Sequence, residues 1–347
     1  MIRLQIKNLM FRLTLIILVI ALTNNIRANS ERPNVILIMC DDLGWGDVGF
    51  NGNKIIKTPN LDSMANSGIK FDQFYAAAPV CSPTRGSVLT GRHPFRYGIY
   101  YANTGHMKKK EFTLAEIMKT KGYRTGHFGK WHMGGQRDVD DAPSIISYGF
   151  DQSLTNFEGM GPKLLPLTLK PGQKEPGRIW SDAERLGEGA KWVLRSKITE
   201  GFVDEAIPFM QESLKKDKPF YINLWPDDVH APFWPPTDKW ADSKRGLFLS
   251  VLQEMDKQLG KLFNAIRDSP KLRDNTIVMV CSDNGPEKGA GVAGPFRGYK
   301  THLYEGGVRS SLVVWGPGIV EAKGVGNKES VFSASDIVPS RLQLSKF

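Results

Sequence analysis

Short apolar runs, rich in β-branched or aromatic residues, recur along the 347-residue chain, and most of them end in a cluster of polar side chains. The runs are NVILIMC, YRTGHFG, PFYINLW and NTIVMVC, and RSSLVVW is a further apolar run. Each is too short for a helix, so the pattern predicts buried strands, most weakly for YRTGHFG. The polar clusters that follow the first four runs are Asp41 and Asp42; Lys130 and His132; Asp227, Asp228 and His230; and Asp283 and Asn284.

Amphipathic helical segments lie between these runs. Thr113 and Glu116 form a capping box at the start of one helix, and Gly122 ends it. The segment FLSVLQEMDKQLGKLFNAI places apolar residues on one helical face: Phe248, Val251, Leu252, Met255, Leu259, Leu262, Phe263 and Ile266. Alternating strands and helices predict an α/β fold with a mostly parallel central sheet and helices on both faces. Ligands bind such sheets at the carboxyl ends of the strands, so we expect the polar clusters to meet on one rim.

Residues 152–200 break this alternation. They contain GMGPKLLPLTLKPGQKEPG, a stretch rich in proline, glycine and lysine. The composition predicts a long irregular excursion, which either shapes substrate access or is a mobile surface loop.

The N-terminal segment has the pattern of a secretory signal peptide. Arg3, Lys7 and Arg12 precede the apolar run LTLIILVIAL, and a polar stretch then reaches Ala28. The pattern predicts a signal peptide over residues 1–28, cleavage after Ala28, and an exported domain over residues 29–347, periplasmic or secreted. An uncleaved anchor is the alternative, but the apolar run is short for a membrane span. No other segment is long and apolar enough to cross a membrane.

The formal net charge is +10. A basic exported protein suits an anionic substrate, although simple solubility explains the charge equally well. The chain has no arginine-rich run, zinc-finger spacing or aromatic RNA-binding motif, so we expect no nucleic-acid partner.

Three cysteines, Cys40, Cys81 and Cys281, are too few and too widely spaced for a disulfide framework or a C-x-x-C metal site. Cys40 and Cys281 end apolar runs and are expected to be small buried residues. In CSPTRGSVLTG, Ser82 is the expected N-cap, Pro83 the first helical residue, and Gly91 the stop.

Cys81 would then lie just before a helix N-terminus, where free backbone N–H groups favour an anion and Arg85 adds positive charge. One interpretation is a nucleophilic thiolate. A cysteine-phosphatase loop, however, has its arginine six positions after the cysteine, and that position is Ser87. The aspartates and Asn284 at the strand ends are hard oxygen ligands for Ca²⁺ or Mg²⁺, which match a thiolate poorly. The mismatch disappears if Cys81 is not a cysteine in the mature protein.

The stretch CSPTR resembles the Cys-X-Pro-X-Arg signature of the sulfatases, a family of the alkaline phosphatase superfamily. In these enzymes the cysteine is oxidised to Cα-formylglycine. The resemblance covers nearly all of residues 33–340 and is nearest the arylsulfatase and N-acetylgalactosamine-6-sulfatase branch. The matching blocks, in family order, are PNVILIMCDDLGWGD, CSPTRGSVLTGRHP, GYRTGHFGKWHMG, DVHAPF, SDNG and PFRGYKTHLYEGGVR.

The resemblance implies a sulfuric ester hydrolase that acts on a sulfated carbohydrate or an aryl sulfate, with a formylglycine-generating enzyme as maturation partner. It implies a divalent metal, usually calcium, with magnesium as the alternative. In the family, one hydroxyl of the hydrated aldehyde attacks sulfur and the second expels the sulfate. The implied metal ligands are Asp41, Asp42, Cys81, Asp283 and Asn284.

The resemblance also assigns catalytic roles. Lys130 and Lys300 would grip the sulfate oxygens, and Arg85 would hold the formylglycine. His132 would assist the hydrated aldehyde, and His230 would protonate the leaving oxygen. The aspartate pair before His230 either orients it or simply forms a turn after the strand.

The sequence departs from the family pattern in two places. Ser310 and Ser311 follow EGGVR, where Val-Pro is common. FSASDIVPSRLQLSKF matches the block that leads into a smaller C-terminal subdomain, so we expect the catalytic domain to be truncated here. Two alternatives remain: a phosphonate or phosphodiester hydrolase of the same superfamily, and an inactive remnant that only binds sulfated glycans.

Overall fold

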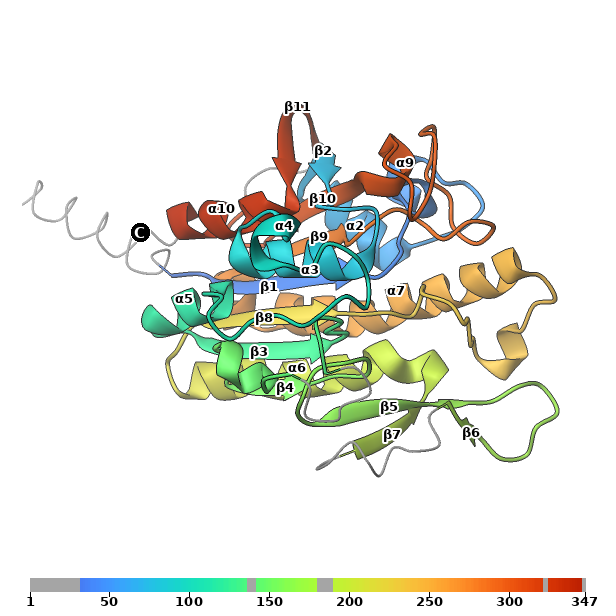
Figure 1. Ribbon diagram of the computed structural model, residues 1–347, viewed down its shortest axis with the longest axis horizontal. Helices are drawn as coiled ribbons and strands as arrows, with labels where there is room; N and C mark the ends of the chain where they lie inside the picture. The colour runs from blue at the N-terminus through green and yellow to red at the C-terminus, as the bar shows by residue number, and fades with distance from the viewer. Residues whose placement is uncertain (1–31, 136–141, 180–189, 321–323, 345–347) are drawn as a thin grey trace, which may run out of the picture.

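A computed structural model describes residues 32–135, 142–179, 190–320 and 324–344. Its centre is an eight-stranded sheet with helices on both faces (Figure 1). In spatial order the strands are β11 (Val325–Ser333), β2 (Ile69–Tyr75), β10 (Arg309–Trp315), β9 (Thr276–Ser282), β1 (Asn34–Cys40), β8 (Phe220–Trp225), β3 (Arg124–Gly129) and β4 (Gln152–Leu154). Among these strands only β10 runs antiparallel to its neighbours. The predicted fold class is therefore confirmed, while the predicted signal peptide over residues 1–28 lies outside the described residues.

Helices cover the two faces of the sheet. One face packs against α3 (Cys81–Thr90), α4 (Pro94–Tyr97), α5 (Leu114–Thr120) and α10 (Ile337–Leu344). The other packs against α2 (Pro59–Asn66), α6 (Ile198–Lys215), α7 (Lys244–Asp268) and α8 (Pro270–Arg273), while the short α9 (Glu305–Val308) precedes β10. No helix of the described residues has the length and apolar composition to cross a membrane.

The side chains of β1 divide the core into two halves. Val35, Leu37 and Met39 belong to the apolar cluster under α3 and α5. Their neighbours Ile36, Ile38 and Cys40 belong to the cluster under α2, α6 and α7. A strand covered on both faces buries every residue, which explains the uninterrupted apolar run in the sequence.

The helix signals predicted for α5 and α7 are confirmed. Thr113 caps α5 in a reciprocal box with Glu116, and Gly122 follows the end of the helix with a φ of 81°. All of the apolar residues predicted for one face of α7 are buried. This face rests on the sheet and on α6 and α2, so α7 is held by packing along most of its length.

The prediction for residues 152–200 was wrong in part, because this segment forms a second, three-stranded sheet. Its order is β6 (Gly177–Arg178), β5 (Lys163–Thr168) and β7 (Ala190–Leu194). Composition concealed β5, since proline is rare in strands. Among the described residues, β6 pairs with Leu167 and Thr168 of β5 and not with Pro166, so the proline lies outside that antiparallel ladder.

Gly129 ends β3 and turns the chain toward Lys130. Its φ is 129°, and a Cβ at this position would lie 2.2 Å from the carbonyl oxygen of Trp225 on β8. No other residue fits this backbone and this close approach.

We predict that Gly129→Ala lowers the free energy of unfolding by about 3 kcal/mol or more, because it adds a backbone clash to the strain of a positive φ. Gly172→Ala is the matched control, since Gly172 also has a positive φ but open space around its Cβ position. This control should cost only about 1–2 kcal/mol. Urea denaturation measures both, and equal losses would contradict the steric argument.

Candidate active site

The polar clusters at the strand ends meet on one rim, as predicted. Backbone hydrogen bonds just beyond the strands hold them there. The amide N–H of Asp41 donates to the carbonyl of Pro226 at 3.0 Å. The amide N–H of Asp283 donates to the carbonyl of Cys40 at 3.3 Å. The amide of Lys130 donates to the Trp225 carbonyl at 3.0 Å, so the ends of four parallel strands, β1, β3, β8 and β9, and their functional residues are held together.

Cys81 is the first residue of α3 and is 1% exposed. The predicted N-cap at Ser82 was therefore wrong: Val80 occupies that position without a side-chain cap. The helix can start earlier because Pro83, now its third residue, still lies where a backbone N–H has no partner within the helix. Gly91 ends the helix in the left-handed conformation, as predicted.

The Cys81 thiol is not poised as a thiolate. Burial, with the carboxylates of Asp41 and Asp283 nearby, raises its pKa to about 12 despite the opposing charge of Lys130. At pH 7 the thiol therefore stays protonated and is a poor nucleophile. The helix N-terminus and Arg85 do not overcome these effects.

Arg85 joins the ends of β1 and β9. Its Nη2 lies 2.6 Å from Oδ2 of Asp283 and 3.3 Å from Oδ1 of Asp41, and none of the three side chains is exposed. Its Nη1 donates to the carbonyl of Lys130 at 3.0 Å, and its guanidinium lies 5.3 Å from the centre of the Trp225 ring. Arg85 is thus a central part of the cluster, next to the residue it was predicted to hold.

Two lysines complete the charge balance. Lys130 Nζ lies 2.5 Å from Oδ2 of Asp41, and Lys300 Nζ lies 2.7 Å from Oδ2 of Asp42. Burial alone would raise the pKa of Asp41, but Lys130 and its cationic neighbours hold it well below the usual range. Although burial opposes this, the Asp41 carboxylate raises the pKa of Lys130. Both ammonium groups therefore remain charged at the rim.

The oxygen donors of the cluster fit a hard divalent cation, whereas the Cys81 thiol and the His230 imidazole are softer ligands. Asp41, Asp42, Cys81 and His230 each offer a ligand atom, and these atoms lie within 4.8 Å of one another. Asp41 Oδ1 and Asn284 Oδ1 are buried and accept no hydrogen bond from the described residues. Carboxylate and amide oxygens without donors are the ligands that Ca²⁺ and Mg²⁺ prefer.

Asp283 and Asn284 also belong to this group. Asn284 Nδ2 donates to Oδ1 of Asp42 at 2.7 Å, and Oδ1 of Asp283 accepts the amide N–H of Asp42 at 3.2 Å. Burial and the neighbouring Asp41 carboxylate raise the pKa of Asp283 to about 8. A bound cation would relieve this repulsion between carboxylates.

Backbone strain is concentrated at the rim. Of the six non-glycine residues with positive φ in the described segments, four lie at or beside the site. They are Asp42 at 57°, Asn103 at 60°, His132 at 56° and Thr301, next to Lys300, at 76°. Such conformations cost energy and persist where the surrounding structure enforces them, which is common at functional sites.

The two predicted histidines line the same cavity as Cys81. Nε2 of His132 lies 2.8 Å from Oδ1 of Asn103. His230 Nδ1 lies 2.7 Å from the carbonyl oxygen of Ala231, and its Nε2 lies 3.8 Å from Oδ2 of Asp42. Burial and the charge of Lys130 lower the pKa of both histidines, so both are neutral at pH 7.

Asp227 and Asp228 serve other partners than the His230 ring. Asp227 forms an ion pair with Arg195, and Asp228 accepts a hydrogen bond from Thr199. Burial raises the pKa of Asp228 to about 7. The backbone amide of His230 donates to the Asp227 carbonyl at 3.0 Å. The aspartate pair therefore belongs to a turn after the strand, which is the second of the two interpretations given above.

A cavity of about 360 Å³ opens over Cys81 and brings together Lys130, His132, His230 and Lys300. Sequence reasoning missed much of its wall, which includes Asn103, Asn156, Phe157, Pro166, Ile179 and Arg195. Most of these residues come from residues 152–200. This segment therefore borders the site, as expected from the interpretation that it shapes substrate access. Its composition carried no signal for which side chains would face inward.

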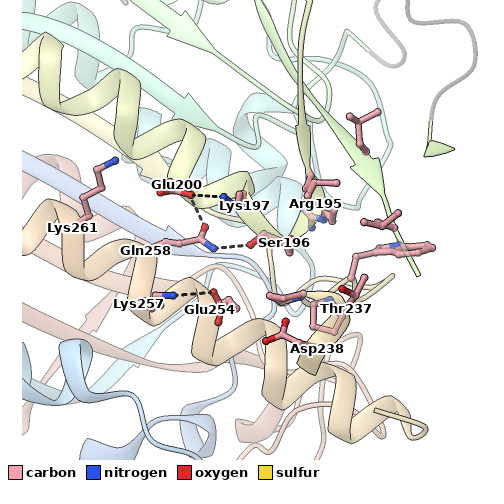
Figure 2. A pocket seen from close by; sticks show the side chains of 16 residues that line it. Arg195, Ser196, Lys197, Glu200, Thr237, Asp238, Glu254, Lys257, Gln258 and Lys261 are labelled. Atoms are coloured by element: carbon pink, nitrogen blue, oxygen red, sulfur yellow. Dashed lines mark hydrogen bonds and ion pairs between the residues drawn. The ribbon is translucent and has the colours of Figure 1, made fainter. Parts of the chain in front are cut away.

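A larger cavity, of about 450 Å³, shares Arg195 with the site and lies between β5, α6 and α7 (Figure 2). Gln258 forms part of its wall and joins the two helices: it accepts the amide N–H of Glu200 and donates to the carbonyl of Ser196, both at 2.7 Å. Size therefore does not identify the chemical site, since the catalytic candidates line the smaller cavity.

Ser310 and Ser311 also find an explanation. The hydroxyl of Ser310 accepts the backbone N–H of Ser282 at 2.8 Å, next to Asp283, and the chain is irregular between Ser310 and Leu312. Asn51 donates to the hydroxyl of Ser311. Both serines thus brace the end of β9 against β10 and the loop after β1.

Ligands bind open α/β sheets at the carboxyl ends of the strands, and here that rim gathers carboxylates and cations beside Cys81 at the start of α3. A family model described as Sulfatase matches residues 33–346. The chain belongs to the sulfatase family.

Individual relatives agree with this assignment. The chain is 32% identical to human N-acetylgalactosamine-6-sulfatase over 337 residues, which cover 91% of this chain and 62% of the relative. It is 32% identical to human arylsulfatase A over 340 residues, 92% of this chain and 65% of that one. The chain thus spans less than two thirds of the length of these relatives.

Solved structures show the same fold. Ps i-CgsB in complex with k-i-k-neocarrahexaose is 27% identical, with a TM-score of 0.75 over 91% of this chain and 72% of that one. The PsFucS1 sulfatase from Pseudoalteromonas sp. is 25% identical, with a TM-score of 0.71 over 94% and 70% of the two chains.

We predict that a thiol reagent at pH 7.5 leaves the native, unmatured chain unlabelled and labels three cysteines in guanidinium chloride, because all three are buried. Burial raises the pKa of each thiol, so each is protonated at this pH. Mass spectrometry of the peptides gives the result. Selective labelling of native Cys81 would contradict the protonated, closed thiol.

Proposed function

We propose that the chain is a sulfuric ester hydrolase that removes sulfate from a sulfated carbohydrate or an aryl sulfate. One observation carries the proposal: Cys81 lies buried at the start of α3, beside three carboxylates and the cations of Arg85, Lys130 and Lys300. These surroundings do not activate an unmodified thiol, because a pKa of about 12 keeps it protonated. An oxygen nucleophile next to a hard cation fits them.

The family resemblance supplies that nucleophile, as formylglycine made from Cys81 by a maturation enzyme. As a hydrate it offers one hydroxyl to attack sulfur and a second to expel the sulfate. Asp41, Asp42, Asp283 and Asn284, with the modified residue, would hold Ca²⁺, or Mg²⁺ as the alternative. When bound, the cation supplies positive charge that favours the ionised nucleophile and the sulfate oxygens.

Lys130 and Lys300 bind the sulfate in this proposal. Both line the cavity over Cys81, and both stay protonated because, against the effect of burial, Asp41 raises the pKa of Lys130 and Cys81 with Asp42 raises that of Lys300. Their ammonium groups oppose the negative charge that grows on the sulfate oxygens in the transition state. Arg85 keeps Asp41 and Asp283 in place beneath them.

His230 protonates the leaving oxygen. Its pKa in the free protein is lowered by burial and by Lys130, so this role requires that the negative charge of the bound ester helps it to gain a proton. Nε2 is the nitrogen available for this step, since Nδ1 lies against the Ala231 carbonyl. His132 lines the same cavity and assists the hydrated aldehyde.

A carbohydrate ester is the preferred substrate class. The cavity of about 360 Å³ is lined by amide side chains as well as by charged groups. Among the relatives, one is named for N-acetylgalactosamine 6-sulfate and a similar structure holds a neocarrahexaose. The basic, apolar and polar pattern of residues 1–28 supports export of the enzyme to a compartment that contains such polymers.

We predict that Cys81→Ser, incubated with substrate and metal, accepts one sulfo group and keeps it, because a serine ester lacks the second hydroxyl that expels sulfate. Cys81→Ala should stay unmodified, and both variants should lose turnover. Intact mass spectrometry and sulfate release measure these outcomes. Turnover by the alanine variant, or far faster turnover of phosphate diesters by the matured chain, would contradict the proposal.

We predict that His230→Ala loses about 10²- to 10⁴-fold in kcat/KM on a sugar sulfate but less than about tenfold on nitrophenyl sulfate, because nitrophenolate leaves without a proton. His93→Ala, which removes an exposed histidine, is the control. Steady-state kinetics of the matured chains on both esters decide the matter. Equal losses on the two esters would show that His230 is not the general acid.

A further inference from the structure

We infer that Asn103 is a positioning residue that fixes the tautomer and ring orientation of His132, so that Nδ1 is left as the acceptor at the reaction centre. The functional part of this inference rests on the proposed sulfatase activity. Asn103 lies outside every motif of the sequence, and it is exposed where the cavity wall begins.

The contact between the two side chains is direct. Oδ1 of Asn103 lies 2.8 Å from Nε2 of His132, a normal hydrogen-bond length. Asn103 reaches it from a left-handed backbone conformation, with a φ of 60°. The loop is braced next to Asn103, where the Thr104 hydroxyl donates to the Tyr101 carbonyl at 2.6 Å and accepts the Tyr101 N–H at 3.2 Å.

The ring of His132 is held on a second side. Phe157 packs edge-on against it, with ring centres 4.9 Å apart and an interplanar angle of 87°. The backbone of His132 is itself left-handed, with a φ of 56°, and its amide lies 3.4 Å from the Phe157 carbonyl. The imidazole plane is therefore set by packing, and the hydrogen bond to Asn103 sets which nitrogen carries the proton.

The tautomer follows from the acceptor. His132 is neutral, because burial and the charges of Lys130 and Arg85 lower its pKa well below the usual value. A neutral imidazole has one N–H, and a carbonyl oxygen at Nε2 stabilises the proton on Nε2. Nδ1 is then an acceptor, and it is buried without a hydrogen-bond partner among the described residues.

An unpaired buried acceptor is costly unless a ligand satisfies it. His132 and Cys81 line the same cavity, and a matured Cys81 would carry hydroxyl groups that the thiol lacks. Nδ1 can accept a proton from such a hydroxyl only in the tautomer that Asn103 selects. Without Asn103, the proton can move to Nδ1 and block this acceptor.

The direct test is the tautomer itself. Long-range ¹H–¹⁵N correlation spectra of the matured, metal-loaded chain with ¹⁵N-labelled histidine report each of its six imidazoles, and His132→Gln assigns the relevant one. We expect the Nε2–H form in the unaltered chain and in Asn103→Asp, which keeps an acceptor. We expect a mixture or the Nδ1–H form in Asn103→Ala.

Thr104→Ala is the matched control, since it removes the neighbouring loop hydrogen bonds and leaves Asn103 in place. It should keep the Nε2–H form. An Nδ1–H form in the unaltered chain, or an unchanged tautomer in Asn103→Ala, would overturn the inference. A tautomer change in Thr104→Ala equal to that in Asn103→Ala would also overturn it, because loop order alone would then be responsible.

Kinetics test the consequence for catalysis. At equal formylglycine content, Asn103→Ala should lower kcat by about 10- to 100-fold with little change in KM, and Asn103→Asp should recover most of the loss. A rise in KM with kcat unchanged would overturn the inference in favour of substrate binding by Asn103. If the unaltered matured chain hydrolyses no ester, the proposed function fails, while the spectra still decide the role of Asn103.

Discussion

The buried ion pairs of Arg85 are the interaction on which the site depends. One guanidinium holds Asp41 from β1 and Asp283 from β9, and neither partner touches water. Breaking such a pair leaves an uncompensated buried charge, which is costly. Lys130 and Lys300 pair with Asp41 and Asp42, so three cationic side chains face the carboxylates of the rim, and a divalent cation would add further positive charge. Positive charge at the rim suits a negatively charged sulfate ester.

The parallel sheet explains why residues so distant in sequence meet here. Strands β1, β3, β8 and β9 end at the same edge, and backbone bonds between their last residues hold the clusters together. Helix α3 brings Cys81 to the same edge from one face. Asp42 and His132 adopt positive φ values, which cost conformational energy, in the turns that direct their side chains into the site.

Sequence reasoning succeeded where a residue follows a strong periodic pattern. The buried strands, the cap of α5 and the convergence of Asp41, Lys130 and Asp283 could all be predicted, because apolar runs and parallel topology determine them. It failed where local composition misleads: Pro166 and its neighbours concealed the small sheet. It also missed Asn103, Asn156 and Arg195, because loop residues gain their role only from tertiary contacts that no spacing encodes.

The central claim is that Cys81 serves as a precursor and not as a thiol. The most direct measurement is mass spectrometry of the tryptic peptide that spans residues 71–85, from chain produced beside an active formylglycine-generating enzyme. The account predicts that Cys81 loses sulfur and gains oxygen. An unmodified thiol, with a control substrate fully converted in the same cells, would contradict it.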